Sequence, residues 1–206
     1  MIYNTIKYLY KKDFKMIKLV FASHNENKIK EVKRLLEGQF EVLSLTDINC
    51  FDDIPETADT IEGNAILKAN YVTQHFGLNC FADDSGLLID ALNGAPGVYS
   101  ARFAGEPKND TNNLNLVLQK LGEQNNRDAH FKTVIALNLN GEQHLFEGKI
   151  FGEITQEPIG NNGFGYDPIF IPEGFTKTFA EMTIDEKSGM SHRGQAIKQL
   201  INFLKY

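Results

Sequence analysis

The chain has 206 residues, 42% of them hydrophobic, and its 21 basic and 27 acidic side chains give a formal net charge of −6. A chain of this length can bury one substantial core without disulfides or structural metals, and its composition excludes fibrous and disordered classes. The acidic balance argues against broad binding to nucleic acid, since phosphate contacts need clustered Lys and Arg, and no apolar run approaches the length of a membrane span.

The first fifteen residues differ in character from the rest of the chain. Segment 1–15 mixes aromatic and basic residues, has no continuous apolar stretch and does not look like a signal peptide. Met16 then offers a second start, so we expect a frayed or artefactual extension over 1–15 and a single two-lobed domain over 16–206. Cys50 and Cys80 stand far apart in no metal-binding spacing, which predicts reduced, buried thiols in a cytoplasmic protein.

The first part of the chain alternates strands with helices. Apolar runs predict strands over 17–22 and 41–45, and helical periodicity predicts helices over 26–37 and 60–76. An acidic loop, 47–59, separates the second strand from the second helix. The apolar faces of the two helices are Ile29, Val32, Leu35 and Leu36 in the first, and Ile61, Ala65, Ala69, Val72 and Phe76 in the second.

The second part contains a long hairpin. A strand predicted over 79–82 runs into the turn-like sequence Asp83-Asp84-Ser85-Gly86, and another short strand follows over 87–91. A helix is predicted over 111–121, and a final helix over 191–204. Two long strands, over 130–139 and 145–154, are joined through Asn140-Gly141, the dipeptide most favoured in tight hairpins. Together these elements predict a mixed α/β sheet with flanking helices, in two lobes about a cleft.

Two of the polar segments could bind a phosphate and a metal ion. Ser23-His24-Asn25-Glu26-Asn27-Lys28 lies between a strand and a helix N-terminus, where free N–H groups favour an anion; an ordinary capped turn is the alternative. Asp83-Asp84-Ser85-Gly86 and Glu56 supply carboxylate oxygens, which suit Mg²⁺ bound together with water and phosphate. A nearby carboxylate could then take a proton from attacking water. The alternative here is a solvated Asp-Gly turn.

Two further segments could contact a base. Gly163-Phe164-Gly165-Tyr166-Asp167-Pro168 offers two flat aromatic faces, unless Phe and Tyr simply fill the core. Glu186-Lys187 and Ser191-His192-Arg193-Gly194 offer positive charge, and an Arg fork can bind a phosphate or an exocyclic carbonyl. The alternative for the last segment is a helix capped by Ser191 with exposed charges.

Taken in this order, the segments resemble the inosine/xanthosine triphosphate pyrophosphatase family, which hydrolyses deaminated purine nucleotides. The resemblance covers 16–204 and rests on FASHNENKIKEV, ETADTIEGNAILKA, ADDSGLLIDALNGAPGVYSARFAG, GFGYDPIF and EKSGMSHRGQA. It implies an elongated α/β fold of two lobes, an active site in the cleft between them, and a homodimer. It also implies Mg²⁺-dependent hydrolysis of ITP, dITP and XTP to the monophosphate and pyrophosphate.

The resemblance also implies roles for individual residues. Glu56 and Asp84 would engage Mg²⁺, and Asp84 would be the general base for water attacking the α/β phosphoanhydride, with Asp83 in support. The triphosphate would be held by Ser23, His24, Asn25, Glu26, Asn27, Lys28 and Ser85. The base and sugar would be surrounded by Phe164, Gly165, Tyr166, Asp167, Lys187, His192 and Arg193. A donor such as Arg193 would accept a 6-keto oxygen and reject the amino group of adenine.

The chain departs from the family pattern in its phosphate loop and in its extension over 1–15. His24 and Asn27 stand where glycine is common, so any left-handed backbone angle there would fall on less tolerant residues. Two other classes stay open: a nucleotide-sensing module without turnover, and a pyrophosphatase acting on pyrimidine or methylated nucleotides.

Overall fold

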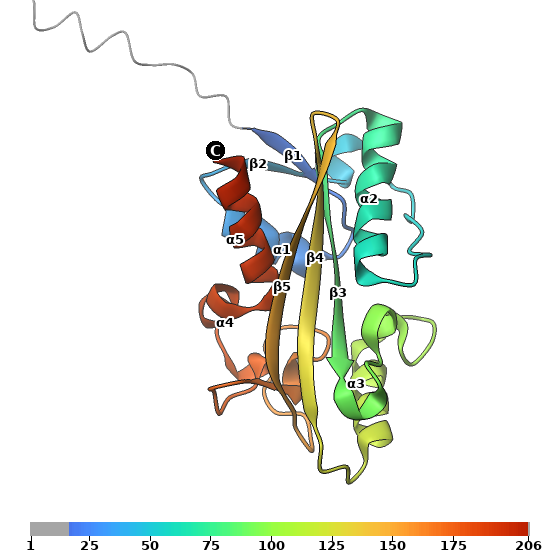
Figure 1. Ribbon diagram of the computed structural model, residues 1–206, viewed down its shortest axis with the longest axis vertical. Coiled ribbons are helices and arrows are strands. Elements are labelled where there is room, and N and C mark those ends of the chain that lie inside the picture. Colours follow the sequence, from blue (N-terminus) through green and yellow to red (C-terminus); the bar gives the residue numbers. More distant parts are fainter. Residues whose placement is uncertain (1–16, 206) are drawn as a thin grey trace, which may run out of the picture.

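The computed structural model describes residues 17–205, and the extension predicted over 1–15 lies outside the described residues. The chain forms one six-stranded sheet, elongated along its three longest strands, with helices on both faces (Figure 1). The strands are β1 (Lys18–Phe21), β2 (Glu41–Ser44), β3 (Cys80–Ile89), β4 (Asp128–Leu139), β5 (Glu142–Ile154) and β6 (Phe170–Pro172). The α-helices are α1 (Glu26–Leu36), α2 (Ile61–Phe76), α3 (Asp110–Leu121), α4 (Ile184–Met190) and α5 (His192–Leu204).

The sheet is mixed, as the sequence predicts. Its strand order is β2-β1-β3-β4-β5-β6, with β1 parallel to β2 and β3 and all other pairs antiparallel. The predicted hairpin is confirmed, because β4 and β5 pair continuously from Asp128 with Glu153 to Leu139 with Glu142 and turn at Asn140 and Gly141. Both of these residues have positive φ, 51° and 90°, which is the backbone that a tight type I′ turn requires.

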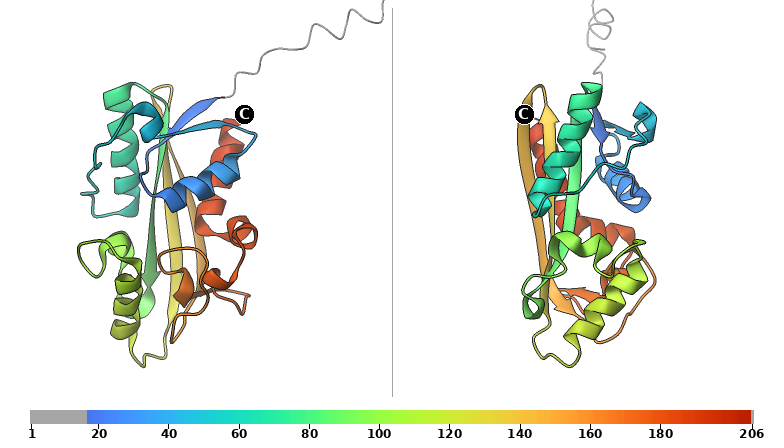
Figure 2. Two further views of the ribbon diagram at one scale, coloured as in Figure 1. Left: turned by 180° about the vertical axis from the view of Figure 1, so that it is seen from behind. Right: turned by 90° about the vertical axis from the view of Figure 1, so that its right-hand side faces the viewer.

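Alternation along β1 gives each face of the sheet its own helices. Leu19 and Phe21 join the core that contains α1 and α5, whereas Val20 and Ala22 join the core that contains α2. Successive side chains of a strand point to opposite faces, so one short apolar run serves both layers. Figure 2 shows the helices on the two sides of the long strands.

A third core fills the half of the molecule away from β1 and β2. There α3 packs with the far ends of β3 and β4 and with the short 3-10 helices η5 (Asp167–Ile169) and η6 (Phe179–Glu181). Two further 3-10 helices, η3 (Asp90–Leu92) and η4 (Gly97–Arg102), connect β3 to α3. The three long strands run through both halves, so they fix the distance between the two sets of helices.

The turn predicted at 83–86 is wrong. β3 is one continuous strand, and each of its residues pairs with β4. Its other edge pairs with β1 only at Cys80 and Phe81, and no strand within residues 17–205 pairs that edge over 82–87. Polar side chains and Gly86 are therefore tolerated in mid-strand. Gly86 is needed because a Cβ there would lie 2.4 Å from the carbonyl oxygen of Gly97.

The helix boundaries follow from local capping. The Thr60 hydroxyl accepts a hydrogen bond from the Gly63 N–H at 3.0 Å, and Gly77 ends α2 in the left-handed conformation. The predicted apolar stripe of α2 is buried from Ile61 to Val72, but α2 also buries Asn64 and Lys68. The final predicted helix is confirmed as α5, with Ser191 as its N-cap.

Two other expectations concern the cysteines and membrane segments. Cys50 and Cys80 are both buried, as predicted, and both are free thiols. Between residues 17 and 205, no helix combines the length and apolar character needed to cross a membrane.

The packing of α5 on β5 depends on one glycine. A Cβ at Gly148 would lie 2.0 Å from the carbonyl oxygen of His192 and 2.8 Å from the backbone nitrogen of Ala196. We therefore expect Gly148→Ala to lower the free energy of unfolding by about 1–3 kcal/mol, measured by urea denaturation, because α5 must shift away from the sheet. Gly189→Ala in α4 is the matched control, since its Cβ would meet nothing within 4 Å. Equal stability of the two variants would contradict this account.

Candidate active site

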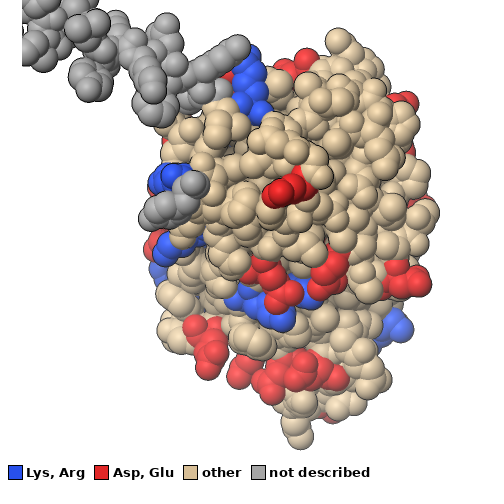
Figure 3. Space-filling model, turned by 45° about the horizontal axis from the view of Figure 1, so that its top comes forward, with Lys and Arg blue, Asp and Glu red and all other residues tan. Residues whose placement is uncertain are grey.

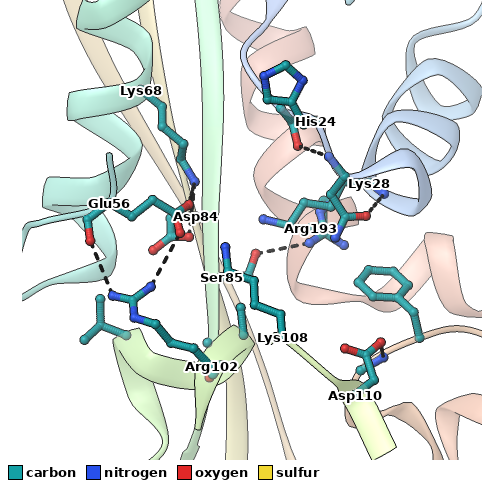
Figure 4. A pocket seen from close by; sticks show the side chains of 18 of the residues that line it. His24, Lys28, Glu56, Lys68, Asp84, Ser85, Arg102, Lys108, Asp110 and Arg193 are labelled. Carbon is teal, nitrogen blue, oxygen red and sulfur yellow. Dashed lines mark hydrogen bonds and ion pairs between the residues drawn. The ribbon is translucent and has the colours of Figure 1, made fainter. Parts of the chain in front are cut away.

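A cavity of about 450 Å³ lies beside the unpaired edge of β3, between the two sets of helices (Figure 4). This volume suits a small-molecule ligand. The residues predicted to bind substrate or metal that line it are Ser23, His24, Asn25, Lys28, Glu56, Asp84, Ser85, Phe164, Gly165, Tyr166, Asp167, Lys187, His192 and Arg193. Glu26, Asn27 and Asp83 are not part of its wall. The structure thus brings four segments that are far apart in the sequence to one cavity.

The loop between β1 and α1 is a capped turn whose cap leaves few amide groups free. The Asn25 side chain accepts hydrogen bonds from the N–H groups of Asn27 and Lys28 at 3.0 and 3.1 Å. Within the described residues, the N–H groups of His24 and Glu26 make no hydrogen bond, so these two remain available to an anion. Neither His24 nor Asn27 has a positive φ, so the missing glycines cause no backbone strain.

The adjacent residues Asp83 and Asp84 point to opposite faces of the sheet and have different partners. Asp83 faces α1 and α5, where both of its oxygens lie 3.2 Å from the Lys28 ammonium and one lies 3.0 Å from the Arg193 Nε. Asp84 faces α2, where it lies 3.3 Å from the Lys68 ammonium. Asp83 is therefore part of the scaffold under the cavity, and Asp84 is the carboxylate that reaches the cavity wall.

Lys68 joins the two carboxylates predicted to bind metal. Its ammonium lies 2.6 Å from Glu56 and 3.3 Å from Asp84, and the side chain is buried against both. Asn64, one turn earlier on α2, lies 3.5 Å from the other oxygen of Asp84 and accepts a hydrogen bond from the Ala58 N–H. Arg102 of η4 approaches Glu56 from the opposite half, 3.3 Å from its carbonyl and 3.7 Å from its carboxylate.

These contacts separate the pKa values of the three carboxylates. Burial raises the pKa of Asp84, and the neighbouring ammonium groups of Lys68 and Lys28 offset only part of that effect. Burial acts in the same direction on Glu56 and Asp83, but there the cations prevail. Lys68 keeps the pKa of Glu56 below its usual value, and Lys28 with Arg193 holds that of Asp83 well below. Asp84 is thus the one of the three whose pKa is shifted upward from its usual value.

Arg193 is held inside the protein by three groups. Its guanidinium contacts Asp83, Glu31 of α1 at 2.6 Å, and the Ser85 hydroxyl at 3.2 Å. Only 2% of the residue is exposed. The Ser191 cap of the alternative interpretation is present, with its hydroxyl accepting from the Gly194 N–H, but the exposed charge of that interpretation is wrong. Burial is possible because Glu31 of α1 and Asp83 of β3 supply carboxylate partners.

The loop 163–168 serves both the cavity and the core. Tyr166 is buried and donates its hydroxyl to the Ser100 carbonyl at 2.7 Å, as the core-filling alternative required. Tyr166 also lines the cavity, as does Phe164, whose ring centroid lies 5.0 Å from the Lys187 ammonium. Asp167 fixes this arrangement, because one of its oxygens accepts from the Phe164 N–H at 2.9 Å and from Lys187 at 2.6 Å.

His192 is a buried, uncharged ring on the same wall. It stacks on Phe131 with ring centroids 4.7 Å apart and ring planes 9° apart. Burial, together with the charges of Arg193 and Lys187, lowers the pKa of His192 well below its usual value. Its Nδ1 is buried and has no hydrogen-bond partner within the described residues, so a polar ligand atom would satisfy it.

Sequence reasoning missed several cavity residues: Lys68, Arg102, Lys108 and Asp110. Lys68 had a detectable signal, because it borders the apolar stripe of α2 directly before Ala69. Asp110 had none, since its contact with the Gly165 N–H, at 2.8 Å, joins residues that are far apart in the sequence. On the face shown in Figure 3, basic and acidic side chains lie beside one another and form no broad basic surface.

The chain is similar to known proteins in both sequence and structure. The chain matches the Ham1 family over residues 19–203. It is 61% identical to a dITP/XTP pyrophosphatase of Flavobacterium johnsoniae, covering 91% of this chain and 98% of that protein. Among solved structures, a HAM1 protein of Coxiella burnetii is 42% identical with a TM-score of 0.85, covering 92% and 99%. The Ham1 protein of Staphylococcus aureus is 41% identical with a TM-score of 0.83, covering 91% and 98%.

The electrostatic link between Lys68 and Asp84 can be measured directly. Lys68→Met removes the ammonium while keeping an unbranched apolar side chain of similar length. We expect Asp84 to titrate at higher pH in this variant, because burial then acts against one cation fewer. An NMR titration of the Asp84 carboxyl carbon checks this, with Lys198→Met on the exposed side of α5 as the control. A midpoint that stays or falls would rule out the link.

Proposed function

The chain belongs to the Ham1 family, and we propose from that membership that it hydrolyses deaminated purine nucleoside triphosphates, namely ITP, dITP and XTP, to the monophosphate and pyrophosphate. One observation carries the proposal. Asp84 and Glu56 both contact the Lys68 ammonium, on the wall of a cavity that is also lined by Phe164. Paired carboxylates suit water activation beside phosphate, and a ring face suits a base.

The donor set around Lys68 fits Mg²⁺. Within residues 17–205, no group of three or more His, Cys, Asp or Glu side chains could hold a metal ion by itself. Mg²⁺ needs only one or two carboxylates when substrate phosphate and water complete its ligands, and Glu56 and Asp84 already converge on the ammonium of Lys68. When bound, the ion would supply positive charge to the phosphate oxygens.

Asp84 is the general base of the proposed reaction. Its raised pKa makes it a stronger base than an ordinary aspartate, and the Lys68 ammonium still favours its ionised form. Asn64 and the pairing of β3 with β4 fix its position beside the cavity. Water attack on the α/β phosphoanhydride breaks that bond and gives the monophosphate and pyrophosphate.

Different residues of the cavity are proposed to bind the triphosphate and the base of the substrate. In this proposal the triphosphate is held by the N–H groups of His24 and Glu26 and by Ser23, Asn25, Lys28 and Ser85; the free amides and the cationic side chains support it. Asn27 is left out, because its N–H is bonded to Asn25 and it lies outside the cavity wall. Phe164 and Tyr166, with Gly165 and Asp167, surround the base and sugar. Lys187, His192 and Arg193 can donate hydrogen bonds to a 6-keto oxygen. The amino group of adenine is itself a donor and cannot accept them.

The proposal extends to the organisation of the protein. Residues 16–206 form a single two-lobed domain that works as a homodimer in the cytoplasm, with nucleotides and neither nucleic acid nor membranes as partners. The continuous pairing of β3, β4 and β5 through both halves supports the single domain. The homodimer and the cytoplasmic location rest on the family resemblance of the sequence.

A substrate panel tests the proposed function. With Mg²⁺ present, we expect ITP, dITP and XTP to be cleaved to the monophosphate, with ATP, GTP and dTTP much poorer, and we expect the second product to be pyrophosphate. Chromatography of the nucleotides and an assay that separates pyrophosphate from orthophosphate provide the measurement. Release of orthophosphate, or a preference for ATP, would overturn the reaction, and a preference for dTTP would overturn the purine class.

Replacing Asp84 tests the general base. Asp84→Asn should lower kcat by roughly 10²–10⁴-fold, because the amide cannot take a proton from water. Nucleotide binding, measured by calorimetry, should persist. Asp53→Asn is the matched control, since Asp53 also lines the cavity but makes no hydrogen bond or ion pair with Lys68, Glu56 or Asp84. If Asp84→Asn keeps wild-type turnover, another group is the base.

A further inference from the structure

The cations on the cavity wall are paired with carboxylates, with one exception. Five of them have carboxylate partners: Lys28 with Asp83, Lys68 with Glu56 and Asp84, Arg102 with Glu56, Lys187 with Asp167, and Arg193 with Asp83 and Glu31. The sixth, Lys108, makes no hydrogen bond or ion pair within residues 17–205 and is exposed. Its positive charge is therefore the one least compensated before a ligand arrives.

Lys108 lies on a segment that is anchored on both sides. Before Lys108, Ala104 and Ala101 are held by the buried side chain of Asn113. That side chain accepts a hydrogen bond from the Ala104 N–H at 2.7 Å and donates one to the Ala101 carbonyl at 3.0 Å. After Lys108, Asp110 accepts from the Gly165 N–H at 2.8 Å. These bonds anchor the segment 104–110 at both of its ends, and Figure 4 shows the Lys108 side chain on the cavity wall.

Lys108 lines the same cavity as the groups that the proposed function assigns to the phosphates. It lines the cavity together with Arg102, and its charge contributes to the lowered pKa of Glu56, after the larger effects of burial, Lys68 and Lys28. Phe164 and His192, which the proposed function assigns to the base, also line this cavity. A triphosphate carries several negative charges, and the paired cations around it are already partly neutralised. The Lys108 ammonium, which has no carboxylate partner among the described residues, can neutralise charge on the terminal phosphates.

Resting on the proposed function, we infer that Lys108 binds the two terminal phosphates of the substrate, the part that leaves as pyrophosphate. The loop after η4 thus contributes a binding residue from the half of the molecule opposite the Ser23–Lys28 loop. The ammonium donates to phosphate oxygens and takes no part in proton transfer. Lys108 therefore contributes to binding of the phosphate chain and not to binding of the purine base.

The two reaction products separate this contact from others. Calorimetry of the full-length protein with Mg²⁺ measures the binding of pyrophosphate and of inosine monophosphate, neither of which contains the bond that is cleaved. We expect Lys108→Gln to weaken pyrophosphate binding by about fivefold to tenfold, the size of one partly exposed charge-assisted contact, and to leave the monophosphate unchanged. Lys108→Arg should stay within about twofold of wild type.

Matched controls decide between the outcomes. Lys177→Gln removes an exposed lysine of the same half that lies outside the cavity, and it should alter neither affinity. Equal weakening of both products, no weakening of pyrophosphate, or undetectable pyrophosphate binding by the wild type would overturn the role of Lys108. The substrate panel on the wild type is a separate measurement: orthophosphate release there would overturn the proposed function whatever Lys108→Gln does.

Discussion

The early end of β1 is the constraint on which the site depends. β1 pairs with β3 at only two positions, and β3 then continues with one edge unpaired. Had β1 been longer, Asp84, Ser85 and Gly86 would lie between two strands and no cavity could open there. The unpaired edge lets the chain place polar groups in mid-strand, while pairing with β4 keeps their positions fixed.

Charge compensation follows from this arrangement. Buried carboxylates and cations alternate around the cavity, so that Lys28, Asp83, Arg193 and Glu31 form one connected network under the wall. Breaking such a buried pair leaves a charge without a partner, which is far costlier than losing an exposed pair. The network is therefore a rigid support. Asp84 lies outside this network, and its burial shifts its pKa upward, opposite to the shifts of Glu56 and Asp83.

Much of the fold could be predicted from local sequence, because hydrophobic periodicity and caps are local signals. The hairpin at Asn140, the stripe of α2 and the cap at Ser191 are of this kind. The prediction of a turn at 83–86 was wrong because Asp and Gly residues, which usually favour turns, are tolerated within a strand that has one unpaired edge. The position of Lys68 beside the apolar stripe of α2 was a local signal, but its contacts with Glu56 and Asp84 could not be predicted, since they depend on packing α2 against β3.

Asp83 and Asp84 share a peptide bond but belong to different parts of the protein. One holds α1 and α5 against the sheet through Lys28 and Arg193, and the other reaches the cavity through Lys68. A mutational library that randomises both codons together would mix folding failures with catalytic failures in a single phenotype. Codon by codon, the same library would divide into two classes, distinguishable by protein abundance in the cell. Neighbouring positions of one strand can in this way evolve under unrelated selection.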